Sequence, residues 1–310
     1  MALLSRVADR VYWGARQMER AEDTARIMRA FSDVFIDFPM AAGLSWEPLV
    51  AISGSAPLSD VASSDRGEAA VVKFIIDDAA NPGSIRSSVE AARENLRTTR
   101  EVMPREAWSA VNQLALFVRA EATGALDRRR RDRVLARVVE ISRRLDGVLE
   151  STMTRDAAYR MWRLGRLVER VDMTTRVIGV RAATLMQSTA HGPTTLDEVQ
   201  WMGVLRSLSA LQMYQRAVRG PIDASDVLGF LLHHEGFPRS VRGCLSAIRA
   251  EVIALPAPGP VLDALSIVEH TLASVNAEGG DGAALDDMMD RLQIAIADVD
   301  RAIISRYVRW

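Results

Sequence analysis

The stretch WGARQMERAEDTAR, residues 13–26, combines regularly spaced apolar residues with a dense set of charges. Met18, Ala21 and Ala25 recur every three or four residues, the spacing that places side chains on one stripe of an α-helix. The charged residues recur at the same spacing, so several of them share a helix face. They are Arg16, Glu19, Arg20, Glu22, Asp23 and Arg26. The stretch therefore predicts a helix with a charged face, which is either solvated, closed against other residues or open to a ligand.

Helical periodicity extends to most of the chain. Apolar residues follow the same spacing in residues 84–103, 132–150 and 285–308. The apolar run VVKFII, residues 71–76, could form a strand, but a lone strand has nothing to pair with. Clusters of glycine, proline and small polar residues predict the joints between helices, at 53–68, 187–195, 255–260 and 276–282. Together these patterns predict an all-α protein.

The charged stretch occurs twice in the sequence. Residues 160–176, RMWRLGRLVERVDMTTR, match residues 10–26 at an offset of 150, with six of 17 positions identical. A second match pairs residues 74–86, FIIDDAANPGSIR, with residues 230–242, FLLHHEGFPRSVR, at an offset of 156. The order of the matches is kept, and a drift of six residues is tolerable in loops.

These matches predict one domain over residues 1–310, built from two tandem copies of a helical unit at about 1–150 and 151–310. Two copies favour a helical bundle with pseudo-twofold symmetry, because an open solenoid usually needs three or more repeats.

Composition limits the classes of function. The formal net charge of −1 argues against an overall electrostatic footprint for nucleic acid or anionic membrane. Cys244 is the only cysteine, so no internal disulfide can form, which fits a reducing cytosol. The first twenty residues are charged throughout, unlike a secretory signal, and no apolar run reaches the roughly 18 residues of a membrane span. We therefore expect a cytoplasmic protein.

Nucleotide-binding and hydrolase motifs are absent from the sequence. Lys73, the only lysine, is followed by Phe74, so the chain has no P-loop. It also has neither a G-x-G-x-x-G fingerprint nor a G-x-S-x-G elbow. We expect no cofactor, and any nucleotide activation would come from a partner.

Four segments occur in one order along nearly the whole chain: LLSRVADRVYWGARQMERAEDTAR, DDAANPGSIRSSVEAARENLR, MTRDAAYRMWRLGRLVERVDMTTR and FPRSVRGCL. Together they resemble the bacterial alpha-E family, which is all-helical and of uncertain biochemistry. That family is typically encoded beside a circularly permuted ATP-grasp ligase and a transglutaminase-like peptidase. The resemblance therefore implies that these two proteins are partners of the chain in a peptide-forming or peptide-tagging system.

The family pattern E-R-A-E-x-x-x-R is met in the first copy, from Glu19 to Arg26. The second copy departs from the pattern, with Val171 in place of the alanine and Asp172 in place of the second glutamate. If chemistry needs two long carboxylates in each copy, this departure puts the second copy in doubt.

Four carboxylates in the repeated stretches are candidate catalytic groups. Glu19 and Glu22 can reach one point above a helix face, and Glu169 with Asp172 could meet them across a pseudo-twofold axis. Di-iron bundles also collect carboxylates, but they need Glu-x-x-His on two helices, and this chain has none. Arginines on the same helix also oppose a cation, so no metal is expected.

The arginines of the same stretches allow two alternatives. They could pair with the carboxylates in a network that fixes how the two copies dock. They could instead bind an anion or a substrate carboxylate, as a peptide-handling system would need. The residues concerned are Arg16, Arg20, Arg26, Arg166, Arg170 and Arg176.

The second repeated segment predicts the start of a helix. Asn81 is a suitable N-cap and Pro82 a suitable first helical residue. Ser84 and Arg86 would then lie in the first turns, where backbone N–H groups can bind an anion. Their counterparts are Ser240 and Arg242, and there Phe237 replaces the cap, which predicts weaker capping.

Other reactive or charged segments have ordinary structural interpretations. The side chains of residues 233–235, HHE, diverge by about 100° along a helix, so we expect a solvated or helix-terminal pair of histidines. Cys244 is expected to be a small core residue. The basic run DRRRRDR, residues 127–133, predicts a solvated helix start without the aromatics that single-stranded nucleic acid needs. Residues 278–287 lack the ligand spacing of a calcium loop.

The sequence thus favours a helical accessory or scaffold of an ATP-grasp amide ligase, not catalytic on its own, which binds the ligase or a peptide or amino-acid substrate. An alternative is an enzyme that acts on amide bonds with Glu19 and Glu22 as acid–base carboxylates. A carboxylate-bridged metal enzyme is a third hypothesis. Neither nucleic acid nor membrane is expected as a partner.

Overall fold

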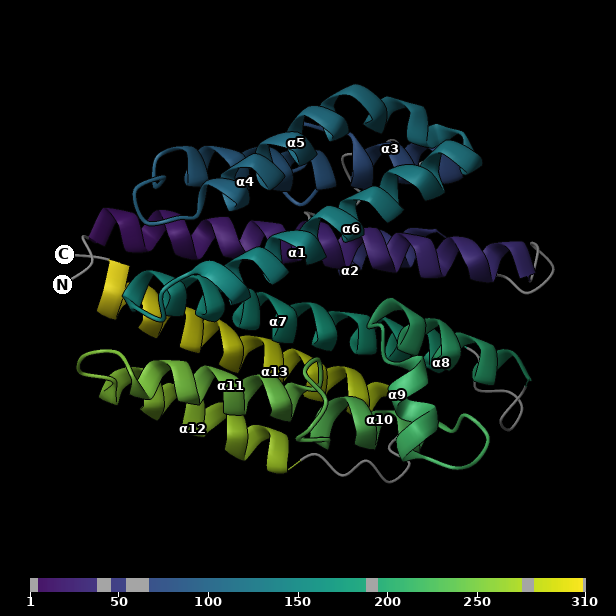
Figure 1. Ribbon diagram of the computed structural model, residues 1–310. Helices are drawn as coiled ribbons and strands as arrows, with labels where there is room; N and C mark the ends of the chain where they lie inside the picture. Colours follow the sequence, from purple (N-terminus) through teal and green to yellow (C-terminus); the bar gives the residue numbers. More distant parts are fainter. Residues whose placement is uncertain (1–4, 38–45, 54–66, 188–194, 275–281, 309–310) are drawn as a thin grey trace. The chain divides into compact units, whose positions relative to one another are not determined.

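The structure, a computed structural model, describes residues 5–37, 46–53, 67–187, 195–274 and 282–308. Within these residues every element of regular structure is a helix, which confirms the all-α prediction (Figure 1). The run at residues 71–76 lies in a helix and not in a strand. The chain divides into two compact units: Met1–Arg29 with Phe38–Arg166, and Ala30–Asp37 with Leu167–Trp310.

The first unit contains α1 (Ser5–Asp37) as far as Arg29 and the helices that follow it up to the start of α7 (Ala157–Gln187). Its helices are α1, α2 (Glu47–Ile52), α3 (Glu68–Ile76), α4 (Ile85–Arg97), α5 (Arg105–Glu121), the 3-10 helix η2 (Ala122–Leu126), α6 (Arg128–Thr152) and the first turns of α7. Helix α5 packs against both α4 and α6. The apolar residues of α6 that recur at helical spacing, including Val134, Val138 and Leu145, are buried, so periodicity identified this core face correctly.

The second unit is also made of packed helices in its described residues. Its helices are the rest of α7, α8 (Thr195–Ser207), α9 (Leu211–Ala217), α10 (Ala224–His233), α11 (Val241–Ile253), α12 (Gly259–Ala273), α13 (Gly282–Ile303) and a π-helical turn η3 (Ile304–Val308). Helix α12 packs against α13 along its length and also against α11 (Figure 1). Buried leucines and valines, such as Leu265, Val268 and Leu292, form the core between them.

Helix boundaries differ from the expected ones by a few residues. The helix expected over 84–103 ends at Arg97, and Thr98 is its C-cap. The helix expected over 132–150 begins earlier, at Arg128, because the Asp127 side chain caps it by accepting from the Arg130 N–H. The joint expected at 255–260 is confirmed by the break between α11 and α12. The joints at 53–68, 187–195 and 276–282 lie largely outside the described residues.

Helices α4 and α11 correspond closely. Each has 13 residues, and their first residues, Ile85 and Val241, are 156 positions apart. Each begins after a serine, Ser84 or Ser240, whose hydroxyl accepts a hydrogen bond from a backbone N–H of the first turn. The offset equals that of the second sequence match.

Candidate functional site

The charged face of α1 is buried in the first unit. Glu19 and Glu22 have 0% and 1% of their surface exposed, and their spacing of three residues brings both carboxylates to one side of the helix. Helix α6 and the start of α7 supply the residues that surround them, which are Arg143, Asp146 and Arg166.

Arg166 lies at the centre of this cluster. Its Nε donates to a Glu19 carboxylate oxygen, its Nη2 donates to Glu22 Oε2 at 2.9 Å, and its Nη1 pairs with Asp146. A planar guanidinium offers five N–H donors in a fixed fork, which allows one arginine to bind three carboxylates. We call Glu19, Glu22, Asp146 and Arg166 the arginine–carboxylate cluster.

Further arginines border the cluster. Arg26 pairs with Asp23, and its Nε also lies 3.7 Å from Glu22 Oε1. The Nε of Arg143 lies 3.8 Å from the same oxygen. The Arg143 side chain is 59% exposed and that of Asp146 36%, so the cluster reaches solvent on its α6 side.

A close approach of two helices places Arg166 within reach of α1. A Cβ at the preceding residue, Gly165, would lie 2.4 Å from the backbone oxygen of Tyr12 and 3.0 Å from the Cβ of Ala15. Only glycine leaves room for backbones this close. The small residue therefore sets the distance that the Arg166 side chain spans.

The three candidate arginines of α1 differ in exposure and contacts, and their binding of an anion stays a prediction. Arg16 is 9% exposed, and its guanidinium carbon lies 5.3 Å from the centre of the Trp13 ring, a distance suited to a cation–π contact. Arg20 is partly exposed. Arg26 is buried in its pairing with Asp23.

In the second unit the corresponding residues of α7 contact the turn before α11. Arg170 Nη1 donates to Pro238 O at 3.3 Å, and the Thr174 hydroxyl donates to Arg239 O at 3.4 Å. Arg176 Nε donates to Asp172 Oδ2 at 3.0 Å. Glu169 is wholly buried. The expected meeting of these carboxylates with Glu19 and Glu22 involves both units and stays a prediction.

The capping prediction for the NPGSIR and FPRSVR segments was wrong. The helices begin three residues later than expected, with Ser84 and Ser240 as N-caps. Asn81 instead closes the preceding turn, because its Oδ1 accepts from the Gly83 N–H at 2.9 Å and its Nδ2 donates to Phe74 O at 2.9 Å. Phe237 is a buried core residue, so it does not weaken the cap.

The side chains expected to bind an anion at these helix starts differ between the units. Arg86 donates to Asp77 Oδ1 at 3.0 Å and lies 3.6 Å from Glu90. The hydrogen bond to Asp77 raises the pKa of the Arg86 guanidinium. Arg242 is exposed and forms no side-chain hydrogen bond or ion pair with the described residues. The Arg86 guanidinium is therefore paired with carboxylates of the protein, whereas the Arg242 side chain faces solvent.

The other reactive residues have structural positions. His233 ends α10 and His234 is its C-cap, which confirms the helix-terminal interpretation. Cys244 is 1% exposed, and its Sγ lies 3.3 Å from Pro238 O, as expected of a core cysteine. The basic run begins α6 as predicted, except that Arg131 is buried and donates to Ala125 O at 2.9 Å. Of the segment 278–287, residues 278–281 lie outside the described part, and residues 282–287 are the first residues of α13.

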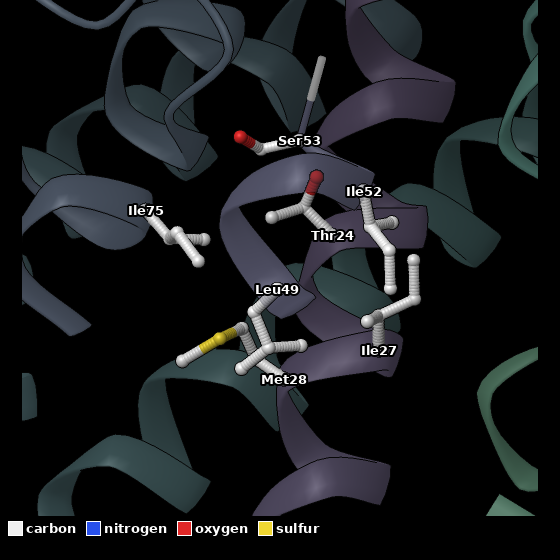
Figure 2. A pocket seen from close by; sticks show the side chains of 7 residues that line it. All are labelled: Thr24, Ile27, Met28, Leu49, Ile52, Ser53 and Ile75. Carbon is white, nitrogen blue, oxygen red and sulfur yellow. The ribbon is translucent and has the colours of Figure 1, made fainter. Parts of the chain in front are cut away.

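A small pocket opens beside α1 in the first unit, between α1, α2 and α3 (Figure 2). It is lined by Thr24, Ile27, Met28, Leu49, Ile52, Ser53 and Ile75. The space available to the centre of a water molecule is about 10 Å³, near the minimum for holding one water. The Thr24 hydroxyl is buried there and has no hydrogen-bond partner among the described residues. This pocket suits a single water and is too small for an amino acid.

Asp146, a member of the cluster, and Arg143, which borders it, were missed in the sequence. Asp146 and Arg143 lie in α6, outside the repeated stretches, and no motif surrounds them. Helical spacing offered a weak signal, because Asp146 directly follows the core residue Leu145 and so lies at the edge of the buried face. Sequence alone gave no reason to pair it with a residue of α7.

No metal site accompanies these residues. Among the described residues, no group of three or more His, Cys, Asp or Glu side chains is placed to hold a metal ion. Within the cluster the carboxylates converge on a guanidinium, which already supplies the positive charge. None of the helices in the described part combines the length and apolarity that crossing a bilayer requires.

Across its described residues the protein is all-helical. Its arginine–carboxylate cluster includes residues of α1, a helix that carries a Glu–Arg pair. The chain matches the model of the Alpha-E family, a predicted alpha-helical domain with a conserved ER motif, over residues 3–308. It therefore belongs to the Alpha-E family. The Glu–Arg pair occurs twice in the sequence, at Glu19–Arg20 and Glu169–Arg170. No curated protein and no solved structure matches the chain.

Proposed function

We propose that the chain is a non-catalytic helical accessory of an ATP-grasp amide ligase, which it binds or supplies with a peptide or amino-acid substrate in the cytoplasm. The observation that carries the proposal is that Arg166 donates hydrogen bonds to the carboxylates of both Glu19 and Glu22. A general acid or base must bring an oxygen within about 3 Å of a substrate proton. These carboxylates are buried and bound to protein, so they are suited to hold α1 and α7 together and not to transfer protons.

The partners in this proposal come from the family resemblance. The sequence has no P-loop and no G-x-G-x-x-G fingerprint, which assigns the activation of a carboxylate by ATP to the ligase. The transglutaminase-like protein would then act on the amide product. In this scheme the helical chain contributes a rigid surface, and the arginine–carboxylate cluster keeps that surface in one conformation.

The proposal includes two tandem copies of one helical unit, at about residues 1–150 and 151–310. The equal lengths and serine caps of α4 and α11 support it. The copies differ at one matched position: Arg166 binds carboxylates, whereas the guanidinium carbon of its counterpart Arg16 lies 5.3 Å from the centre of the Trp13 ring.

Reconstitution with the ligase tests the proposal. The purified ligase would be assayed for ATP consumption and amide formation with and without the helical chain. We expect no turnover by the helical chain alone and a faster or more specific reaction when both are present. A pull-down between the two proteins would measure binding independently of activity.

Two variants make the test decisive. Glu19→Gln and Glu22→Gln keep the size of each side chain and remove its charge. If the helical chain alone forms or hydrolyses amide bonds, and either substitution abolishes that turnover while circular dichroism shows a folded protein, the accessory role is wrong and the chain is an enzyme. If the chain neither binds the ligase nor alters its reaction, the partnership is wrong.

A further inference from the structure

Helix α6 carries a row of arginines on the face opposite its buried residues. The row consists of Arg129, Arg130, Arg133, Arg137 and Arg144, all exposed or partly exposed. At about 100° per residue these five positions fall within an arc of roughly 100° around the helix axis. The core residues of α6 lie on the other side. We call this row the α6 arginine face.

Three of these arginines have no partner in the described protein. Arg137 Nη1 donates to Glu140 Oε1 at 2.6 Å, and Arg144 Nη2 donates to Gln113 Oε1 at 2.7 Å. The side chains of Arg129, Arg130 and Arg133 form no hydrogen bond or ion pair with any described residue. Their guanidinium donors are therefore available to an external ligand.

The position of the three free arginines is electrostatically unfavourable for the isolated chain. They lie in the first two turns of α6, where the helix dipole is positive and favours acidic residues, and α6 has no acidic residue in its first turn. Arg129 and Arg133 are also four residues apart, a spacing at which like charges repel. By contrast, the adjacent Arg128 is neutralised by a two-pronged pair with Glu68. An anionic partner would relieve the unfavourable charges.

The spacing and chemistry of the face indicate the kind of partner. Arg129, Arg133 and Arg137 are four residues apart, which is about 6 Å along the helix. Carboxylates four residues apart on a second helix have the same spacing. Guanidinium groups bind carboxylates with two parallel hydrogen bonds, a geometry that lysine lacks.

Two observations favour an acidic protein segment over a nucleic acid. The whole of helix α6 contains no aromatic residue on which a base could stack. Glu140 lies within the same arc and pairs with Arg137, and the whole chain has a net charge of −1, which offers little long-range attraction to a polyanion. We propose that the α6 arginine face binds an acidic helical segment of a partner protein. This proposal does not depend on the ligase partnership.

A peptide-binding experiment tests the proposal. The probe is a fluorescent helical peptide with glutamates at every fourth position, and its matched control carries glutamines there. We expect the glutamate peptide to bind the full chain in low salt and the glutamine peptide not to bind. The triple variant Arg129→Gln/Arg130→Gln/Arg133→Gln should bind about tenfold more weakly, as expected from the loss of three exposed ion pairs.

A control variant distinguishes loss of the α6 arginine face from a change in net charge as the cause of weaker peptide binding. Arg97→Gln/Arg291→Gln/Arg301→Gln also removes three exposed arginines, but each of these is paired with a carboxylate of its own helix. We expect this control to bind the peptide within about twofold of the natural chain, since rim charges away from the contact contribute little. Equal loss of binding in both triple variants would overturn the proposal, because net charge alone would then explain it.

Three further measurements complete the test. Tighter binding of a single-stranded oligonucleotide than of the peptide, lost in the α6 triple variant, would show that the face binds nucleic acid and would overturn the proposal. The α6 triple variant should melt at the same temperature as the natural chain or higher, because it removes unpaired positive charges from a helix N-terminus. A folded triple variant that still binds the peptide with unchanged affinity would equally contradict the proposal.

Discussion

At the scale of single residues, Arg166 supplies the positive charge that pairs with the buried carboxylates of α1. It binds Glu19, Glu22 and Asp146 together, so its removal leaves carboxylates buried without their cation. Loss of one partner of a buried ion pair costs far more than the pair contributes. We therefore expect Arg166→Met to lower the free energy of unfolding by about 3–5 kcal/mol, measured by denaturant titration.

The matched control for this prediction is Arg301→Met. Arg301 also pairs with an aspartate, but its side chain is 70% exposed, so its loss should change the free energy of unfolding by no more than about 0.5 kcal/mol. Similar losses in the two variants would mean that the cluster is as weak as a surface ion pair.

The cluster also shows how far the sequence could predict a site. The repeated stretches identified Glu19, Glu22 and Arg166 as candidates, because charges recurred at helical spacing. Asp146 could not be identified, since its approach to Arg166 depends on how α6 turns into α7 and not on any local pattern. Arg131 was expected to be solvated with its neighbours, but its donors reach Glu68 and carbonyls of η2, contacts that no helical periodicity reveals.

At the scale of helices, the space beside a glycine, where a Cβ would lie, shows how closely two helices pack. Gly165 has the Tyr12 carbonyl oxygen within 2.4 Å of its notional Cβ, whereas Gly147 of α6 has no atom within 4 Å. Gly165→Ala should therefore destabilise the protein by about 1–3 kcal/mol, because backbone must move. Gly147→Ala should stabilise it by about 0.5–1 kcal/mol through helix propensity. Thermal melts of both variants give the comparison, and destabilisation by both would contradict it.

The two serine caps allow a second prediction at this scale. Ser84→Ala removes an N-cap and should cost about 1 kcal/mol. Ser240→Ala removes the corresponding cap and also the contact of the hydroxyl with His234 O at 2.5 Å, which should add about 0.5–1.5 kcal/mol. Denaturant titrations of the two variants measure the difference. Equal losses would mean that the extra contact contributes nothing.

The caps also show why helix starts were predicted less well than helices. Asn81 and Ser84 are both good capping residues, and Pro82 is a good first helical residue, so local chemistry allowed two starts. The structure uses the later start because Asn81 is committed to Phe74 O and the Gly83 N–H. Sequence periodicity established the existence of α4, but the choice between caps depended on the preceding turn.

At the scale of the whole molecule, titrating groups limit the pH range of stability. The hydrogen bond from Arg128 lowers the pKa of Glu68, and the hydrogen bond from Tyr159 lowers the pKa of Glu150. Burial, followed by the hydrogen bond to Glu150, raises the pKa of Tyr159 to about 12. Tyr159 Oη lies 2.5 Å from Glu150 Oε2. This one hydrogen bond shifts the pKa of both groups and therefore affects the stability of the fold in acid and in base.

The signs of these pKa shifts predict the shape of the stability profile. A glutamate with a lowered pKa stabilises the folded state above its unfolded pKa of about 4.3, and this contribution is lost as pH falls through the folded pKa. A tyrosine with a raised pKa contributes fully below its unfolded pKa of about 10 and loses that contribution as pH rises from there. We expect a plateau between these limits, followed by a decline between pH 10 and 12. Tyr159→Phe should reduce the slope of that decline by up to about 1.4 kcal/mol per pH unit, measured by denaturant titration at each pH. An unchanged slope would mean that Tyr159 ionises at its ordinary pKa and that its bond to Glu150 does not persist in solution.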